Sequence, residues 1–211
     1  KGIVEKLASE QAALDSAWEE ISTHWTRRFA AAPLTHLSPE QLGWTILRAT
    51  GMMDRQRAAS AAEINKKTPL KPEEQQDPAK VAARAQQIEQ AALAKLQASV
   101  DQFVKLFGAG SGQPQHEFFA TVDQALFFSN GSQLSGWLAP NGDNLTGRLL
   151  KIEDPAALSE ELYLSLFTRK PTSEEAARVA SYLAARPQEK TLVVREMAWA
   201  LLTSAEFRFR R

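Results

Sequence analysis

The segment DPAKVAARAQQIEQAALAKLQASVDQFVKLF, residues 77–107, decides the fold class of this chain. Asp77 followed by Pro78 is typical of a helix start, because aspartate caps free backbone N–H groups and proline is tolerated in the first turn. Glycine follows at Gly108, where helices commonly end. Apolar residues recur at helical spacing in between, at Val81, Ile88, Leu96, Val100, Phe103 and Phe107. The segment therefore predicts one long helix with a buried face.

The residues at the start of the chain predict a second long helix. Over residues 3–31 the apolar side chains are three, four or seven positions apart, which places them on one helical face. Pro33 ends this pattern. Trp18 and Trp25 lie seven positions apart on the apolar face, and we expect both in the core.

A third helical region lies between these two. The sequence SPEQ at residues 38–41 is a capping box, in which Ser38 and Gln41 satisfy each other's free N–H groups. Gly51 weakens the continuity of the helix toward Ala62, since glycine costs about 1 kcal/mol against alanine inside a helix. Residues 65–76 are polar and contain two prolines, which predicts an exposed loop.

The remainder of the chain predicts shorter helices. Residues 121–138 are apolar and helical in pattern, with an interruption at Asn130-Gly131-Ser132, and residues 140–144 predict a turn. Further helical segments are predicted over residues 145–152, from Asp154-Pro155 onward, from the capping box between Thr172 and Glu175, and over residues 188–205.

Together these elements predict an all-α fold, an irregular helical bundle with long amino-terminal helices and shorter carboxy-terminal helices. We expect a long-helix bundle over residues 1–112, with its polar loop at 65–76. A short-helix subdomain over residues 113–211 packs on this bundle, and one single domain is the alternative.

Composition narrows the classes of function. The chain of 211 residues contains no cysteine, which excludes disulfides, thiolate catalysis, cysteine-ligated zinc and covalently attached haem. Its 25 basic and 25 acidic residues balance, so charge gives no reason to expect nucleic acid as a partner. No apolar run approaches the roughly 18 residues of a membrane span. No signal peptide opens the sequence, and we expect any such leader to lie outside it.

Four stretches occur in an order that resembles a bacterial family. They are residues 37–42 with 48–51, residues 121–131, residues 161–175 and residues 198–207. The order is similar to the carboxy-terminal domain of unknown function in large exported proteins of planctomycetes and related bacteria, which often also contain a c-type cytochrome domain. The resemblance implies a multi-domain parent protein, a periplasmic or otherwise extracytoplasmic location, and no catalytic residues. Residues 65–112 fall outside it, and whether they are an insertion stays open.

Few ionisable residues have the spacing of a metal site or of an acid–base catalytic pair. Glu20 and His24 lie four positions apart on the first helix, but a single pair of this kind favours a solvated pair over a metal site. His116 beside Glu117 needs a third group for acid–base catalysis, so we favour an ordinary loop histidine.

Two glycine-containing stretches are also better explained by structure than by chemistry. Residues 141–144, NGDN, lack the alternating ligand pattern of a calcium loop and fit a turn in which Asn144 caps the next helix. Residues 108–112 lack the preceding strand of a phosphate-binding loop and are interpreted as a linker. We therefore predict no catalytic residue, no metal and no cofactor in this chain.

The residues expected to contact a ligand or partner are Asn130, Gly131, Ser132 and Trp137. Asn130-Gly131 either breaks a buried helix and presents backbone groups to a ligand, or forms an ordinary helix end and turn, which we favour. Trp137 stands beside a predicted turn and is expected to be exposed. Trp199 lies among alanine and leucine residues and is expected in the core.

The favoured hypothesis is a non-catalytic helical interaction or scaffold module of a larger exported bacterial protein, which holds other domains or an envelope protein in place. The alternative is an accessory module of an extracytoplasmic polysaccharide-processing or electron-transfer protein, whose chemistry lies in other domains and whose ligand is a glycan. A third hypothesis places a ligand pocket beside Asn130, between the bundle and the carboxy-terminal helices.

Overall fold

The computed structural model describes residues 2–28, 35–108 and 122–210. His116, Glu117 and residues 109–112 of the glycine-rich stretch lie outside the described residues. The structure confirms an all-α fold with a single pair of two-residue strands among the described residues. Its residues form two compact units, one of Lys1–His36 with Phe209–Arg211 and one of Leu37–Arg208.

The smaller unit contains helix α1, Gly2–Arg27, and the strands β1, Thr35–His36, and β2, Phe209–Arg210, which pair antiparallel. The apolar face of α1 is exposed: Trp18 is 72% and Trp25 is 55% exposed. The prediction that these two tryptophans lie in the core is therefore wrong. Helical periodicity shows which face of α1 is apolar, but it does not show what covers that face.

The larger unit begins with helix α2, Pro39–Ala49, and the predicted capping box is confirmed. The Ser38 Oγ accepts a hydrogen bond from the Gln41 backbone N–H at 3.1 Å, and the Gln41 side chain accepts one from the Ser38 N–H at 3.0 Å. The chain then breaks at Gly51, whose φ of +81° favours glycine. Helix α3, Met52–Lys67, follows in a new direction.

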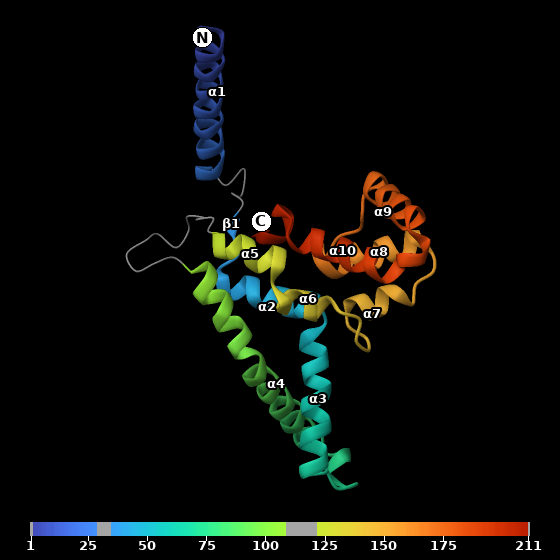
Figure 1. Cartoon of the computed structure of the whole chain (residues 1–211). Helices are drawn as coiled ribbons and strands as arrows, with labels where there is room; N and C mark the ends of the chain where they lie inside the picture. The colour runs from blue at the N-terminus through green and yellow to red at the C-terminus, as the bar shows by residue number, and fades with distance from the viewer. Residues whose placement is uncertain (1, 29–34, 109–121, 211) are drawn as a thin grey trace. The chain divides into compact units, whose positions relative to one another are not determined.

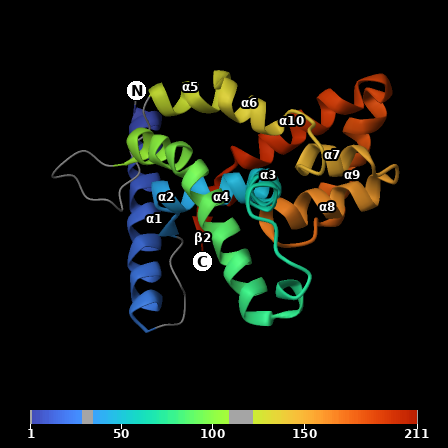
Figure 2. The same ribbon diagram turned by 90° about the horizontal axis from the view of Figure 1, so that it is seen from below.

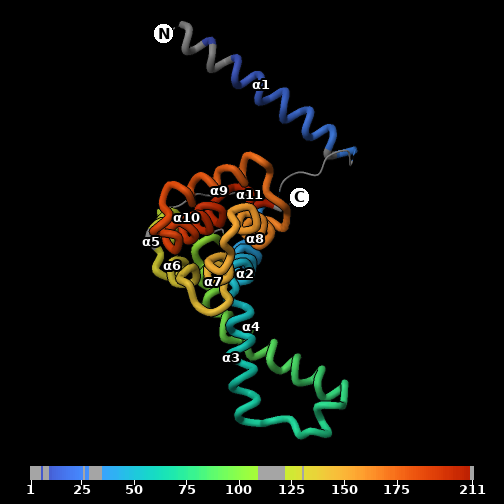
Figure 3. Tube along the Cα trace, turned by 90° about the vertical axis from the view of Figure 1, so that its right-hand side faces the viewer, coloured from blue at the N-terminus to red at the C-terminus, as the bar shows by residue number. Residues whose placement is uncertain are grey.

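Helices α3 and α4 form an antiparallel hairpin that projects from the rest of the larger unit (Figures 1 and 3). Helix α4, Pro78–Phe107, begins as predicted, with the Asp77 side chain accepting a hydrogen bond from the Ala79 N–H at 2.9 Å. Helix α3 continues to Lys67, so the predicted loop starts three residues later than residue 65, and a 3-10 turn, Glu74–Gln76, lies at its end. An ion pair between Lys67 and Glu63 supports this last helical turn.

The carboxy-terminal half of the larger unit consists of shorter helices. They are α5 Val122–Asn130, α6 Ser132–Leu138, α7 Leu145–Leu150, α8 Pro155–Phe167, α9 Ser173–Ala185, a 3-10 turn Pro187–Glu189, α10 Lys190–Leu202 and α11 Ala205–Arg208. Three predicted helix starts are confirmed, with Asn144, Asp154 and the pair Thr172 and Glu175 as caps. In the described residues, no helix is both long and apolar enough to cross a membrane.

One hydrophobic core joins these helices, and its residues range from Leu42 to Phe207, on both sides of residue 112. In the view of Figure 2, α4 and α2 lie beneath α5 and α6. Trp137 belongs to this core: it is 8% exposed and its ring stacks on Phe103, with 6.2 Å between centroids. The prediction of an exposed Trp137 is wrong, because the turn that follows at residues 140–144 does not orient α6, whereas packing against α4 does.

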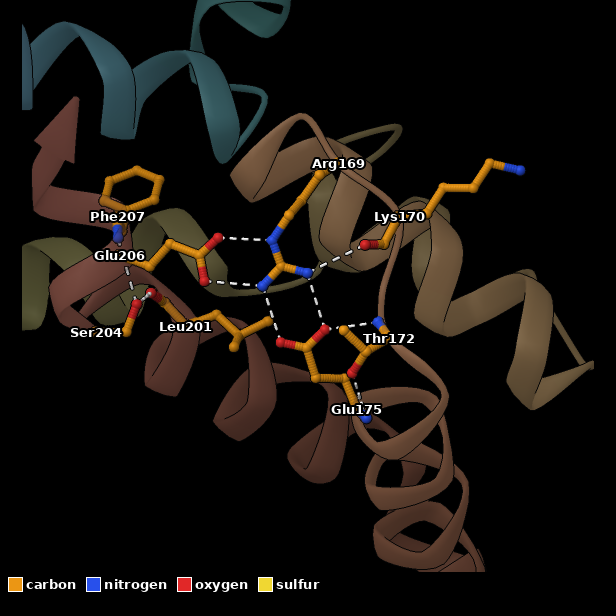
Figure 4. A network of polar contacts seen from close by, with 8 residues as sticks. All are labelled: Arg169, Lys170, Thr172, Glu175, Leu201, Ser204, Glu206 and Phe207. Carbon is orange, nitrogen blue, oxygen red and sulfur yellow. Dashed lines mark hydrogen bonds and ion pairs between the residues drawn. The ribbon is translucent and has the colours of Figure 1, made fainter. Parts of the chain in front are cut away.

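A network centred on Arg169 connects the ends of α8, α9 and α11 (Figure 4). Its guanidinium donates to both carboxylate oxygens of Glu175 at 2.8 Å, to those of Glu206 at 2.6 and 2.8 Å, and to the Lys170 carbonyl at 3.1 Å. These contacts use all five guanidinium N–H groups. Two of the stretches that carry the family resemblance, residues 161–175 and 198–207, therefore meet in a structural contact.

Candidate functional site

A pocket of about 380 Å³ lies between helices α5, α6 and α10. Residue Gly131, at the junction of α5 and α6, lines it, as does Ser132 at the start of α6. The walls also contain four apolar side chains, those of Phe128, Leu138, Leu192 and Trp199. Pockets that hold small ligands combine such apolar walls with a few polar groups, which makes this the candidate site.

The break between α5 and α6 shapes one side of the pocket. The Gly131 N–H donates to the Phe127 carbonyl at 3.1 Å, and the backbone of Gly131 is extended, with φ −64° and ψ 113°. A Cβ atom at this position would lie 2.1 Å from the Phe127 oxygen. The chain passes so close to the end of α5 that any other residue would have to displace the backbone, and α6 would then move relative to α10.

Trp199 supplies the aromatic wall and is 39% exposed. Its indole Nε1–H donates to the Phe128 carbonyl at 2.7 Å, near the end of α5. This hydrogen bond satisfies the polar edge of the ring and fixes its orientation. The prediction that Trp199 lies in the core is wrong: the indole anchors α10 to α5 by one edge and keeps part of its surface in solvent.

Arg195 lies one helical turn before Trp199 and supplies the positive charge of the pocket. Its Nη2 donates to the Ser135 Oγ at 3.0 Å, whereas its Nε is buried without a hydrogen-bond partner. Among the described residues, Arg195 makes no ion pair. Buried polar groups in folded proteins are normally paired, so the guanidinium has capacity to bind a further acceptor.

Glu196 also lines the pocket, but its charge is already compensated. Arg186 donates to the Glu196 carboxylate, and the Tyr182 hydroxyl donates to it at 2.6 Å. The hydrogen bond from Arg186, and then that from Tyr182, lower the pKa of Glu196. Glu196 therefore stays ionised and paired, so it is poorly suited to act as a general acid or base.

A second guanidinium lies close to the same wall. Arg208 stacks over the Phe128 ring, with 4.6 Å from Cζ to the ring centroid, and its Nε is buried without a hydrogen-bond partner. Burial lowers the pKa of Arg208. Among the described residues, neither Arg195 nor Arg208 makes an ion pair with a carboxylate.

The four residues predicted from sequence are only partly brought together. Gly131 and Ser132 line the pocket, Trp137 packs in the core, and Asn130 ends α5 with a side chain that lies outside the described residues. Sequence reasoning missed Arg195 and Trp199. A signal for them was present, since residues four apart share one face of a helix.

A smaller pocket of about 210 Å³ lies between α8, α9 and α10 and is mostly apolar, with Leu162, Val179 and Met197 among its walls. Glu20 and His24 are both exposed on α1. Across the described residues, no group of three or more His, Asp or Glu side chains is placed to hold a metal ion. Comparisons of the chain with protein-family models, with curated proteins and with solved structures find no match.

Proposed function

We propose that this chain is a non-catalytic helical interaction module of a larger exported bacterial protein, and that α1 contacts the partner. The observation that carries the proposal is the exposed apolar stripe of α1. Leu14, Trp18, Ile21 and Trp25 follow one another at steps of four, three and four residues, and each is at least 49% exposed. These steps place the four side chains on one face of the helix.

A stripe of this kind is costly to leave in water. Burying one such side chain fully contributes about 1.5–3 kcal/mol, and amphipathic helices commonly bind by laying an apolar face into a groove of a partner. The opposite face of α1, with Ser16, Glu20 and Thr23, is polar and exposed. We infer that the partner is a folded protein with an apolar groove, either another domain of the parent protein or an envelope protein.

The exported, multi-domain setting rests on the resemblance of residues 121–131, 161–175 and 198–207 to the planctomycete-type domain. The pairing of Glu196 with Arg186 and Tyr182 supports a non-catalytic module, since Glu196 is the one carboxylate that lines the pocket among the described residues. The partly exposed ring of Trp199 in the pocket favours the alternative, an accessory module in a polysaccharide-processing protein.

The test is site-specific photo-cross-linking of the parent protein in the cells that produce it. A photoreactive amino acid in place of Trp18 should form a cross-link to another domain or protein. The matched control is the same amino acid in place of Thr23, on the polar face of α1, which should form none. Trp25→Ala should weaken the cross-link formed from position 18.

Three outcomes would contradict the proposal. Equal cross-linking from positions 18 and 23 would show that the apolar stripe has no special role. Cross-links only between two copies of the chain, with a dimeric mass by light scattering, would make α1 a self-association element. Hydrolysis or oxidation of a substrate by the isolated chain would show that the module is catalytic.

A further inference from the structure

The charges around the pocket between α5, α6 and α10 do not cancel. Glu196 is paired with Arg186, the residue that follows α9, whereas Arg195 donates only to Ser135 among the described residues. The lining of the pocket therefore carries one unpaired positive charge, and a guanidinium is the side chain best matched to a carboxylate. The complementary group on a ligand is an anion with oxygen atoms.

The wall beside Arg195 fits a ring. Trp199 is fixed by its hydrogen bond to the Phe128 carbonyl, and Leu192 lies two turns before it on α10 with 45% of its surface exposed. Because this hydrogen bond already holds the indole ring in place, the Trp199 side chain loses little conformational entropy when a ligand packs against its face. The face accommodates the apolar side of a flat or chair-shaped ring.

Hydroxyl groups line the other side of the pocket. Ser129 and Ser132 are exposed, and within the described part of the chain neither hydroxyl makes a hydrogen bond. Each hydroxyl both donates and accepts, so the two suit a ligand that carries hydroxyl groups. They have no matching group on an aromatic acid, whose ring is apolar throughout.

We propose that this pocket binds a uronic acid, with the sugar carboxylate on the Arg195 guanidinium and one face of the sugar ring against Trp199. The contact does not involve α1, so this proposal stands or falls independently of the partner that α1 binds. A free uronate and a uronate residue of a polysaccharide present the same carboxylate and ring. A volume of about 380 Å³ is at the small end of the range for ligand pockets, which suits one sugar residue.

The experiment is calorimetric titration of the chain with D-galacturonate, with neutral D-galactose as the matched ligand control. Galacturonate should bind with about millimolar affinity, as expected for a small polar ligand, and galactose should bind at least about tenfold more weakly because it lacks the charge-assisted hydrogen bonds. Affinity for galacturonate should fall with added salt. Titration with tetragalacturonate distinguishes a free uronate from a uronate residue of a polysaccharide. If tetragalacturonate binds more tightly than galacturonate, the natural ligand is a polysaccharide.

Arg195→Gln should weaken galacturonate binding about tenfold or more, and Arg195→Lys, which keeps the charge but loses the planar fork, should have an intermediate effect. Trp199→Ala should weaken binding of galacturonate and galactose alike. The control variant is Arg55→Gln, an exposed arginine on α3, which should bind as the wild type does. A thermal melt of each variant shows whether it is folded, and the salt dependence of the wild type tests the charge if Arg195→Gln does not fold.

Several results would overturn the proposal. Equal affinity for galactose and galacturonate would show that Arg195 does not bind the sugar carboxylate. Tighter binding of benzoate than of galacturonate would replace the sugar by an aromatic acid. No detectable binding of galacturonate or tetragalacturonate, or unchanged binding in Arg195→Gln, would show that the pocket is not a uronate site.

Discussion

The hairpin of α3 and α4 and the carboxy-terminal helices α8 to α11 are both helical, but they are held together in different ways. None of residues 61–91 of the hairpin is buried. Its two helices are connected by exposed or half-exposed ion pairs, such as Arg57 with Glu89 and Lys95 with Glu63. In the carboxy-terminal helices, by contrast, every helix contributes buried apolar residues to the core, among them Leu162, Val179 and Leu202.

This difference shows where the stability of the larger unit resides. Burial of apolar surface contributes about 1.5–3 kcal/mol per core residue, whereas exposed ion pairs contribute about 0–1 kcal/mol each. We therefore expect the outer part of the hairpin to open locally at low cost, while α8 to α11 unfold only with the whole unit. The base of the hairpin, at Leu96, Val100 and Phe103, belongs to the core and to the stable part.

The largest expected effect comes from the core. Leu162→Ala should lower the free energy of unfolding by about 2–5 kcal/mol, because it leaves a cavity among fully buried neighbours. The matched substitution in the hairpin, Ile88→Ala, should cost about 1 kcal/mol, because the side chain is only half-buried. Urea unfolding followed by circular dichroism measures both. Equal losses in the free energy of unfolding would show that apolar burial stabilises the hairpin as much as it stabilises the carboxy-terminal helices.

An intermediate effect is expected at Arg169, which joins α8, α9 and α11 (Figure 4). Arg169→Met should cost about 1–2 kcal/mol at neutral pH, because it removes the charge-assisted hydrogen bonds that Arg169 donates to two partly exposed carboxylates. Arg178→Met, an exposed arginine on α9, is the control and should have little effect.

The effect of Arg169 should depend on pH. The hydrogen bonds from its guanidinium, and to a smaller extent those with Thr172, lower the pKa of Glu175 from 4.5 to about 2. Because the pKa is lower in the folded chain, the contact stabilises the fold above about 4.5 and loses this effect as pH falls toward about 2. The difference in stability between wild type and Arg169→Met should therefore shrink over this interval. A difference that stays constant with pH would mean that packing against Tyr163 and Phe167, not charge, accounts for the effect of Arg169.

The smallest effect is expected in the hairpin. Arg57→Ala removes an arginine that pairs with both Glu89 and Asp54, yet it should cost only about 0.5 kcal/mol, since all three side chains are partly or largely exposed to solvent. This loss should disappear in about 1 M salt, where exposed charges are screened. Arg55→Ala, at a neighbouring position that makes no ion pair with any described residue, should leave thermal stability unchanged in either condition. A loss above 2 kcal/mol would contradict the weak role assigned to these ion pairs.

Local signals in the sequence determined the elements of this protein. The capping boxes at Ser38 and Thr172, the caps at Asp77, Asp154 and Asn144, and the break at Gly51 all act over two to four residues. The chain therefore encodes them independently of what packs nearby. The helical fold class and the first part of the pocket, at Gly131 and Ser132, could be predicted for this reason.

Only the tertiary structure decided which apolar faces are covered and which polar groups meet. The sequence predicts an exposed Trp137 and a buried Trp199, whereas Trp137 is buried and Trp199 is partly exposed. The reason is that the exposure of each ring depends on which helices pack on α6 and α10. The pair Arg195 and Ser135 lies sixty residues apart in the sequence, and Arg169 and Glu206 lie 37 apart. No local pattern specifies such contacts, since each exists only once the core has placed two distant helices side by side.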